Sequence, residues 1–119
     1  MSTVKCLLNK FLNYLKEFTF PTQAQKDKEL WDVKGFLKNK SNQEFKFDLR
    51  PIQKVKDNII GKKGHLNTKA DKMVFETSDK WVIVDIEELH EYLKNNKTKI
   101  VYLDKIIKEF YWNIIVNKE

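Results

Sequence analysis

The side chains most able to carry chemistry are a set of cations between residues 50 and 72. This stretch holds seven basic side chains against two aspartates, a net charge of +5 in a chain whose formal net charge is +6. The cations are Arg50, Lys54, Lys56, Lys62, Lys63, Lys69 and Lys72. Concentrated positive charge attracts polyanions, so nucleic acid is the partner that this stretch favours. Because Arg50 is the only arginine of the chain, we expect contacts to phosphates with little reading of base sequence.

A second group of side chains that could carry chemistry is a pair of aspartates, Asp71 and Asp85, which flank two strand-like runs. Each aspartate has a purely structural explanation. Asp71 is typical of a turn before a strand, and Asp85 followed by Glu88 has the spacing of a helix N-cap.

Residues 70–103 resemble the core of PD-(D/E)XK nucleases in the order of their elements: two strands, a helix and a strand. The resemblance places Asp71 and Asp85 near the family's two acidic positions and implies Mg²⁺ as the cofactor. The sequence departs from the family at Glu87, which stands where the catalytic lysine belongs. The resemblance therefore implies either a metal-dependent nuclease or a relative that keeps the fold without the chemistry, and outside it we expect no cofactor.

The run from Ile59 to Gly64, Ile-Ile-Gly-Lys-Lys-Gly, is similar to the GxxG loop of KH domains, which clamps the backbone of single-stranded nucleic acid. A strand and Pro51 precede it, and a hairpin and a helix follow it. About ten residues separate Gly64 from the next predicted strand, which is too few for the family's second helix. A plain helix-cap turn at Gly61 is the alternative.

The elements that must position these residues follow from hydrophobic periodicity and capping signals. We expect a helix over residues 4–18, a second helix from the capping box of Thr22 and Gln25 to about residue 37, and a strand over 41–50. A helix should then run from Pro51 to Gly61. The hairpin is predicted at 73–77 and 81–84, followed by a helix from Asp85 to about residue 96. At the C-terminal end we expect a strand at 100–103 and a short helix, with residues 112–116 as helix or strand.

These elements predict a single α+β domain over residues 1–119. Its parts are two N-terminal helices, a small and mostly antiparallel sheet of three to five strands with a central hairpin, and helices packed on that sheet. Cys6 is the lone cysteine and cannot form an internal disulfide, so a cytoplasmic location is expected. No apolar run is long enough to span a membrane, and no membrane partner is expected.

Three classes of function remain open from the sequence. The leading one is a small, non-enzymatic nucleic-acid-binding module. The alternative is a protein-binding inhibitor or regulator, of the kind mobile elements encode, that uses the lysines against an acidic partner or the acidic segment 85–91 against a basic one. The third is the metal-dependent nuclease or its inactive relative.

Overall fold

The computed structural model describes residues 4–38, 42–50, 58–60, 68–96, 100–111 and 113–118. Its helices are α1 (Val4–Phe11), the 3₁₀ helix η1 (Leu12–Tyr14), α2 (Gln23–Glu29), α3 (Ile86–Asn95) and α4 (Leu103–Glu109). Its strands are β1 (Leu15–Thr19), β2 (Val33–Leu37), β3 (Glu44–Arg50), β4 (Asn58–Ile60), β5 (Lys72–Glu76), β6 (Lys80–Asp85), β7 (Ile100–Tyr102) and β8 (Ile114–Asn117). The α+β class predicted from the sequence is confirmed.

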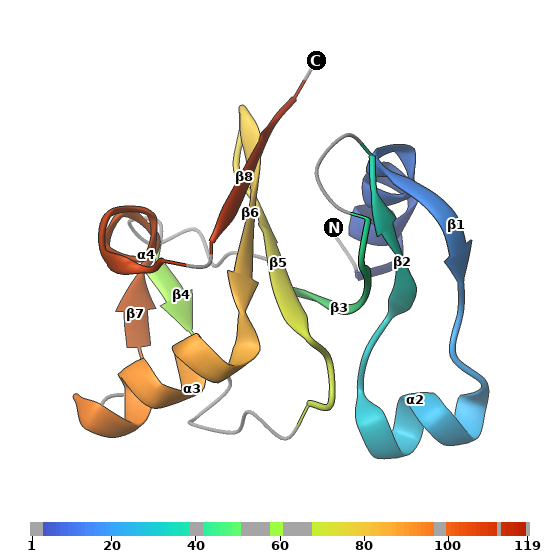
Figure 1. Cartoon of the computed structure of the whole chain (residues 1–119), viewed down its shortest axis with the longest axis horizontal. Helices are drawn as coiled ribbons and strands as arrows, with labels where there is room; N and C mark the ends of the chain where they lie inside the picture. The colour runs from blue at the N-terminus through green and yellow to red at the C-terminus, as the bar shows by residue number, and fades with distance from the viewer. Residues whose placement is uncertain are drawn as a thin grey trace.

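The main sheet has six strands in the order β1-β2-β3-β5-β6-β8, one more than the largest number expected. Neighbouring strands are antiparallel except β3 and β5, which run parallel. The predicted hairpin is β5 and β6, near the middle of the sheet (Figure 1). β4 and β7 pair with each other in a separate two-stranded sheet.

The hairpin buries both of its faces because alternate side chains point to opposite sides. On one face Met73, Phe75, Val82 and Val84 pack with residues of α3 and with Ile106 of α4. On the other, Val74 and Ile83 join Leu7 and Phe11 of α1. In Figure 1, α3 and α4 lie on the left of the hairpin, and the N-terminal elements lie on the right. Within the described ranges, no helix has the length and apolar character needed to cross a membrane.

The predicted first helix is too long, because helical structure ends at Tyr14 and the chain then forms β1. Leu15 already has an extended backbone and pairs with Leu37 of β2, with its side chain 2% exposed. Its place in the apolar stripe fitted a helix equally well. The pairing with β2, which lies far along the chain, decides between the two conformations.

The predicted second helix is also wrong beyond its first turns. The capping box of Thr22 and Gln25 is present, but α2 ends at Glu29 and Leu30 adopts a left-handed cap. Residues 33–37 instead form β2, with a strictly alternating burial pattern. Val33, Gly35 and Leu37 face the core, so this segment has a period of two residues rather than the helical period.

The helix predicted from Pro51 to Gly61 is contradicted at its end. Residues 58–60 form β4, in which Ile59 pairs with Val101 of β7. Consecutive β-branched residues favour a strand once a partner strand is available. Residues 51–57 and 61–67 lie outside the described residues, and with them the GxxG-like turn.

The central predictions hold. The strand before Pro51 is β3, the hairpin is β5–β6, and Asp85 is the N-cap of α3, which ends at Asn95. Glu88 does not complete a capping box; its carboxylate accepts a hydrogen bond from the backbone N–H of Tyr111 instead. At the C-terminal end, residues 114–117 are a strand, β8, which pairs with β6.

Candidate functional site

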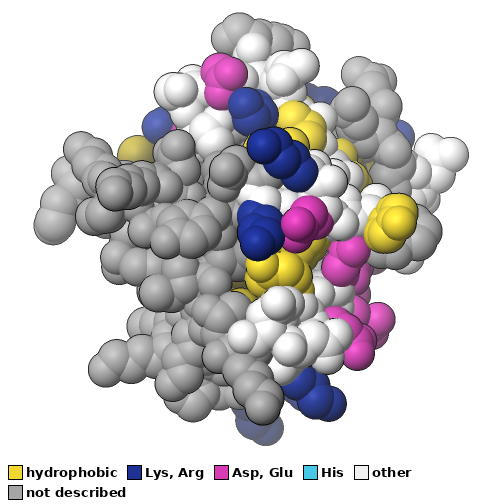
Figure 2. Space-filling view, turned by 90° about the vertical axis from the view of Figure 1, so that its left-hand side faces the viewer, with side chains coloured by type: hydrophobic (Ala, Val, Ile, Leu, Met, Phe, Trp, Pro, Cys, Tyr) yellow, Lys and Arg dark blue, Asp and Glu magenta, His cyan; other side chains and the backbone are white. Residues whose placement is uncertain are grey.

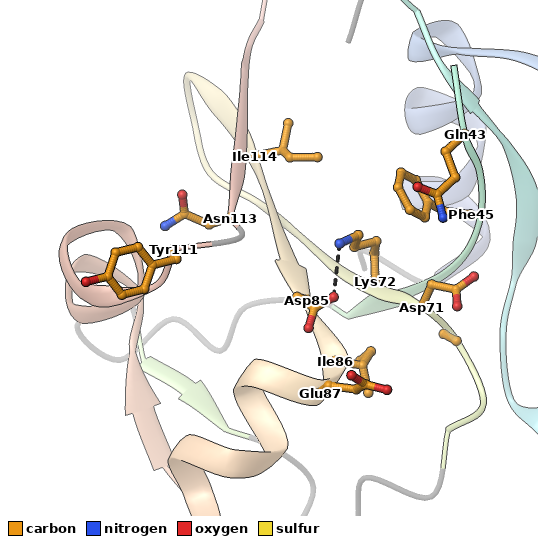
Figure 3. A pocket seen from close by; sticks show the side chains of 11 residues that line it. Gln43, Phe45, Asp71, Lys72, Asp85, Ile86, Glu87, Tyr111, Asn113 and Ile114 are labelled. Atoms are coloured by element: carbon orange, nitrogen blue, oxygen red, sulfur yellow. Dashed lines mark hydrogen bonds and ion pairs between the residues drawn. The ribbon is translucent and has the colours of Figure 1, made fainter. Parts of the chain in front are cut away.

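A pocket of about 490 Å³ opens where β6 runs into α3 (Figure 3). Asp71, Lys72, Asp85 and Glu87 supply its charged groups. Its other walls come from the start of β3 and from the segment before β8, with Gln43, Phe45, Tyr111, Asn113 and Ile114. The fold therefore gathers three of the residues singled out in the sequence, Asp71, Lys72 and Asp85, around one cavity.

The central feature of the pocket is an ion pair between Lys72 and Asp85. The two residues are directly opposite each other on β5 and β6, so their side chains share a face of the sheet. The Lys72 Nζ lies 3.0 Å from the Asp85 Oδ1 and 4.8 Å from the ring centroid of Phe45. The Lys72 side chain is 9% exposed. The ammonium is thus held by a carboxylate and an aromatic face.

Asp85 uses its second oxygen for the backbone. Its Oδ2 accepts a hydrogen bond from the N–H of Glu88 at 3.0 Å, which caps the N-terminus of α3. Both carboxylate oxygens therefore have partners within the protein. Asp85 therefore links the β5–β6 hairpin to the N-terminus of α3.

Asp71 joins β3 to β5. Its Oδ2 accepts the backbone N–H of Lys46 at 2.9 Å, and its own N–H donates to the Lys46 carbonyl at 2.8 Å. Its carbonyl accepts the N–H of Ile86 at 3.1 Å. In Figure 3 the Asp71 carboxylate points toward β3 and away from Asp85.

This donor set does not fit a magnesium ion. Mg²⁺ demands near-octahedral oxygen ligation, and carboxylates reach it best when they converge on one point. Asp71 and Asp85 diverge, and the ammonium of Lys72 occupies the open side of Asp85. Among the described residues, no three His, Cys, Asp or Glu side chains are grouped so that they could hold a metal ion.

The charge of the pocket also disfavours phosphate. Asp71, Asp85 and Glu87 supply three carboxylates against the single ammonium of Lys72. The Lys72 Nζ lies 3.0 Å from the Asp85 Oδ1, so the charge of Lys72 is compensated locally. Lys72, one of the predicted phosphate ligands, therefore lies among carboxylates.

Arg50, the other predicted phosphate ligand at this end of the segment, is also compensated. Its guanidinium makes two hydrogen bonds to Asp48, Nε to Oδ1 at 2.9 Å and Nη2 to Oδ2 at 3.0 Å. These bonds to Asp48 raise the pKa of Arg50 above its usual value. Since the Asp48 side chain is only 5% exposed, the pair is a structural clamp at the end of β3.

Lys69 differs from Arg50 and Lys72, because its side chain is exposed and has no ion-pair partner among the described residues. It lies near Glu29, whose pKa is held below its usual value by a hydrogen bond from Trp31, with Lys46 and Lys69 acting in the same direction. The remaining predicted cations, Lys54, Lys56, Lys62 and Lys63, lie outside the described residues.

The described surface carries no simple basic face on the side of α4 and β7. Figure 2 views the molecule from that side and shows Lys and Arg side chains next to acidic and hydrophobic ones. Mixed charges of this kind are typical of a solvated surface.

The sequence reasoning missed two exposed aromatic residues at the end of β1. Phe18 is 39% exposed and Phe20 is 55% exposed. Phe18 was assigned to the buried stripe of a helix. The alternation of Phe18, Thr19 and Phe20 ahead of Pro21 was the available signal for a strand end.

Comparisons of the chain with protein-family models, with curated proteins and with solved structures find no match.

Proposed function

We propose that this protein is a small nucleic-acid-binding module that contacts phosphates through the lysine-rich segment 50–72 and carries out no catalysis. The observation behind the proposal is the charge distribution, since this segment has a net charge of +5 and the rest of the chain has nearly none. Neutralising phosphates with lysines releases counterions, which supplies affinity without sequence preference.

The ion pairs described above narrow the set of contacting residues. Arg50 and Lys72 are held by Asp48 and Asp85, so we assign them structural roles. The phosphate contacts fall to Lys54, Lys56, Lys62, Lys63 and Lys69. Lys69 supports this assignment because it is exposed and has no carboxylate within ion-pair distance in the described part of the chain.

The test is binding of the purified protein to labelled single-stranded and duplex oligonucleotides over a salt series. A Lys62→Glu/Lys63→Glu variant is compared with Lys94→Glu/Lys108→Glu, which makes the same charge change at two exposed lysines of α3 and α4. We expect affinity to fall linearly with salt on logarithmic axes, and the first variant to weaken binding far more than the second.

Two outcomes would contradict the proposal. Absence of binding at low salt rejects it outright, and equal loss in both variants assigns the affinity to net charge alone. Repeating the assay with Mg²⁺ tests the nuclease alternative. If Mg²⁺ leads to cleavage of the oligonucleotide and Asp71→Asn abolishes that cleavage, the protein is an enzyme rather than a binding module.

A protein-binding regulator is the second candidate, favoured by the negative charge around the pocket. Asp71 and Glu87 line it, and Glu87 and Glu91 are exposed on α3. This surface suits a partner's basic side chains. A lysine-rich probe peptide should then bind in a salt-sensitive way, and Glu87→Gln/Glu91→Gln should weaken that binding; no difference between the two proteins rejects this candidate.

A further inference from the structure

The two edges of the main sheet are protected unequally. β1, at one edge, contains a β-bulge in which Glu17 and Phe18 lie opposite the single residue Gly35. Glu17 has a φ of 51° in this bulge, and the exposed charges of Lys16 and Glu17 lie along the strand. Bulges and edge charges prevent the addition of another strand. β1 is therefore poorly suited to pairing with a further strand.

β8, at the other edge, has neither form of protection. Its sequence is Ile-Ile-Val-Asn, and its ladder with β6 runs without a register shift from Ile114 to Asn117. In the described part of the chain it pairs with β6 and has no strand on its outer side (Figure 1). A regular, uncharged and β-branched edge strand is the type to which another strand adds.

The hydrogen-bonding pattern of the β6–β8 ladder shows which backbone groups of β8 point outward. In an antiparallel ladder, hydrogen-bonded and non-hydrogen-bonded pairs alternate. The Lys118 N–H donates to the Asp79 carbonyl at 2.9 Å, at the end of this ladder. In steps of two from Lys118, Val116 and Ile114 are therefore the residues that bond to β6. The N–H and C=O of Ile115, between them, point away from β6.

The β5–β6 ladder gives the same assignment independently. The Thr77 N–H donates to the Lys80 carbonyl at 2.8 Å, so Lys80 and every second residue after it in β6 bond to β5. Trp81 and Ile83 are left to bond to β8, and they lie opposite the two residues of β8 assigned above. Both ladders therefore place the backbone N–H and C=O of Ile115 on the outer side of the sheet.

The side chains of β8 leave both cores incompletely covered at this edge. Ile115 packs against the core that contains α3, and Ile114 and Val116 pack against the core that contains α1. All three are only partly buried, whereas β5 and β6 are buried along most of their length. A further strand beside β8 would pack against these three side chains on both faces of the sheet.

We propose that β8 pairs with β8 of a second copy of this chain, antiparallel and centred on Ile115. The pairing is self-complementary, because Ile115 of each copy donates its N–H to the Ile115 carbonyl of the other. Ile114 then lies opposite Val116 of the second copy, which gives cross-strand pairs of β-branched side chains. The two six-stranded sheets become one continuous sheet in which β8 is no longer an edge.

The charges at this edge favour a second copy over a charged partner strand. β8 itself has no charged side chain, so it offers no ion pair to a basic or acidic segment. Lys118, which follows it, is already paired with Glu76, with 2.7 Å between Nζ and Oε2. Two copies can therefore meet here without placing unpaired like charges opposite each other along β8. The inference goes beyond the proposed nucleic-acid binding and does not depend on it.

The first experiment measures the molar mass of the full chain by sedimentation equilibrium over a wide range of protein concentrations. Ile115→Pro removes the outward N–H but keeps the N–H groups that bond to β6, a position at which an edge strand accepts proline. Ile115→Val keeps the outward N–H and is the matched control. We expect the parent and the control to dimerise, and Ile115→Pro to dimerise about tenfold or more weakly. Circular dichroism and thermal unfolding show whether the variants fold.

Salt gives a second readout of the same equilibrium. Each copy has a formal net charge of +6, so the two copies repel each other at long range. Added salt screens this repulsion and should strengthen the dimer. Binding to nucleic acid should instead weaken as salt is added, so the two associations can be measured separately.

Amide hydrogen exchange tests the interface in the parent protein, without any substitution. The amides of Ile114 and Val116, which bond to β6, should be protected at every protein concentration. The amide of Ile115 should exchange rapidly in the monomer and about tenfold or more slowly as the dimer forms. This measurement decides the question even if Ile115→Pro does not fold.

Three outcomes would overturn the inference. The first is a parent that stays monomeric at every concentration, and the second is an Ile115 amide that still exchanges freely in the dimer. The third is a dimer that Ile115→Pro leaves intact; if Phe18→Ala/Phe20→Ala dissociates it, the contact is at the exposed rings of β1 instead. Failure of the dimer leaves the proposed nucleic-acid binding standing, and absence of that binding leaves the dimer standing.

Discussion

Lys72 and Asp85 are paired across the β5–β6 hairpin, and their 3.0 Å contact is less exposed on the lysine side than on the aspartate side, 9% against 25%. Loss of the ion pair therefore affects the two side chains differently. Asp85 keeps access to solvent and its bond to the Glu88 N–H, whereas Lys72 depends on Asp85 and on the Phe45 ring.

This inequality predicts that Asp85→Asn is more destabilising than Lys72→Met. The asparagine can still cap α3, but it leaves a buried ammonium without its counter-charge, for a loss of about 2–3 kcal/mol in the free energy of unfolding. Lys72→Met removes the buried charge and should lose about 1 kcal/mol. Urea unfolding measures both, and the double variant should resemble Lys72→Met. A larger loss for Lys72→Met would contradict the assignment.

Lys69 and Lys72 should differ in nucleic-acid binding although both belong to the lysine-rich segment. Lys69→Gln removes an exposed cation, so affinity should fall and the salt slope should decrease by about one phosphate contact. Lys72→Met removes a charge that Asp85 already compensates, so affinity should be unchanged. Anisotropy titrations over a salt series provide the comparison, and equal effects would refute the separation of roles.

Gly35→Ala should weaken the edge of the sheet. Glu17 and Phe18 of β1 lie opposite Gly35 of β2 in a β-bulge. An added methyl would lie 3.0 Å from the Cβ of Phe18 and 3.1 Å from its Cα, contacts tighter than nine in ten of their kind, so β1 must shift by a few tenths of an ångström. We expect a loss of about 1 kcal/mol in the free energy of unfolding. Urea unfolding measures it, and unchanged stability would show that β1 yields without cost.

Glu17→Asn is the matched change on the other side of the bulge. Asparagine adopts the left-handed conformation more readily than glutamate, so the bulge should be kept and stability should not decrease. Urea unfolding measures the free energy of unfolding as for Gly35→Ala, and a decrease would contradict the expectation that the positive φ of Glu17 is unfavourable.

Asp32 should make part of the stability depend on pH. Burial raises the pKa of its carboxyl above the ordinary 3.8, although the ammonium of Lys26 and the N–H of Leu49 act in the opposite direction. Since the folded state holds the proton more tightly, this contribution is complete below 3.8 and is lost as the pH rises through the folded-state pKa. Asp32→Asn lacks this dependence.

The measurement is the free energy of unfolding of the parent and of Asp32→Asn at several pH values between neutral and below 4. The parent should gain stability relative to the variant on acidification, because the neutral acid no longer bears the desolvation cost of its ionised form. A relative loss on acidification would mean that the Lys26 pair outweighs burial.

The capping signals and the strand patterns around the hairpin were readable from the sequence because both are local. Asp85 as an N-cap, Thr22 with Gln25 as a capping box, the sequence alternation in β3 and the apolar, β-branched runs of β5 and β6 depend on residues within a few positions of one another. The α+β class follows from the same signals. The concentration of cations in residues 50–72 is likewise a property of the sequence alone.

Pairings between distant residues were decided only in the tertiary structure. Leu15 and Gly35 lie in segments that satisfy a helical pattern, and they became strands because β1, β2 and β3 can pair with one another. The sequence also did not show which cations are paired with carboxylates. Asp85 neutralises Lys72 from thirteen residues away.

The sequence by itself thus determined the local elements, the class of fold and the sign and place of the charge. The tertiary structure decided which lysine is buried, that Asp71 and Asp85 diverge, and that a bulge of β1 lies against Gly35. The physical reason is that capping and periodicity act over one or two turns of chain. Strand register and burial are instead set by the packing of segments that are far apart in sequence.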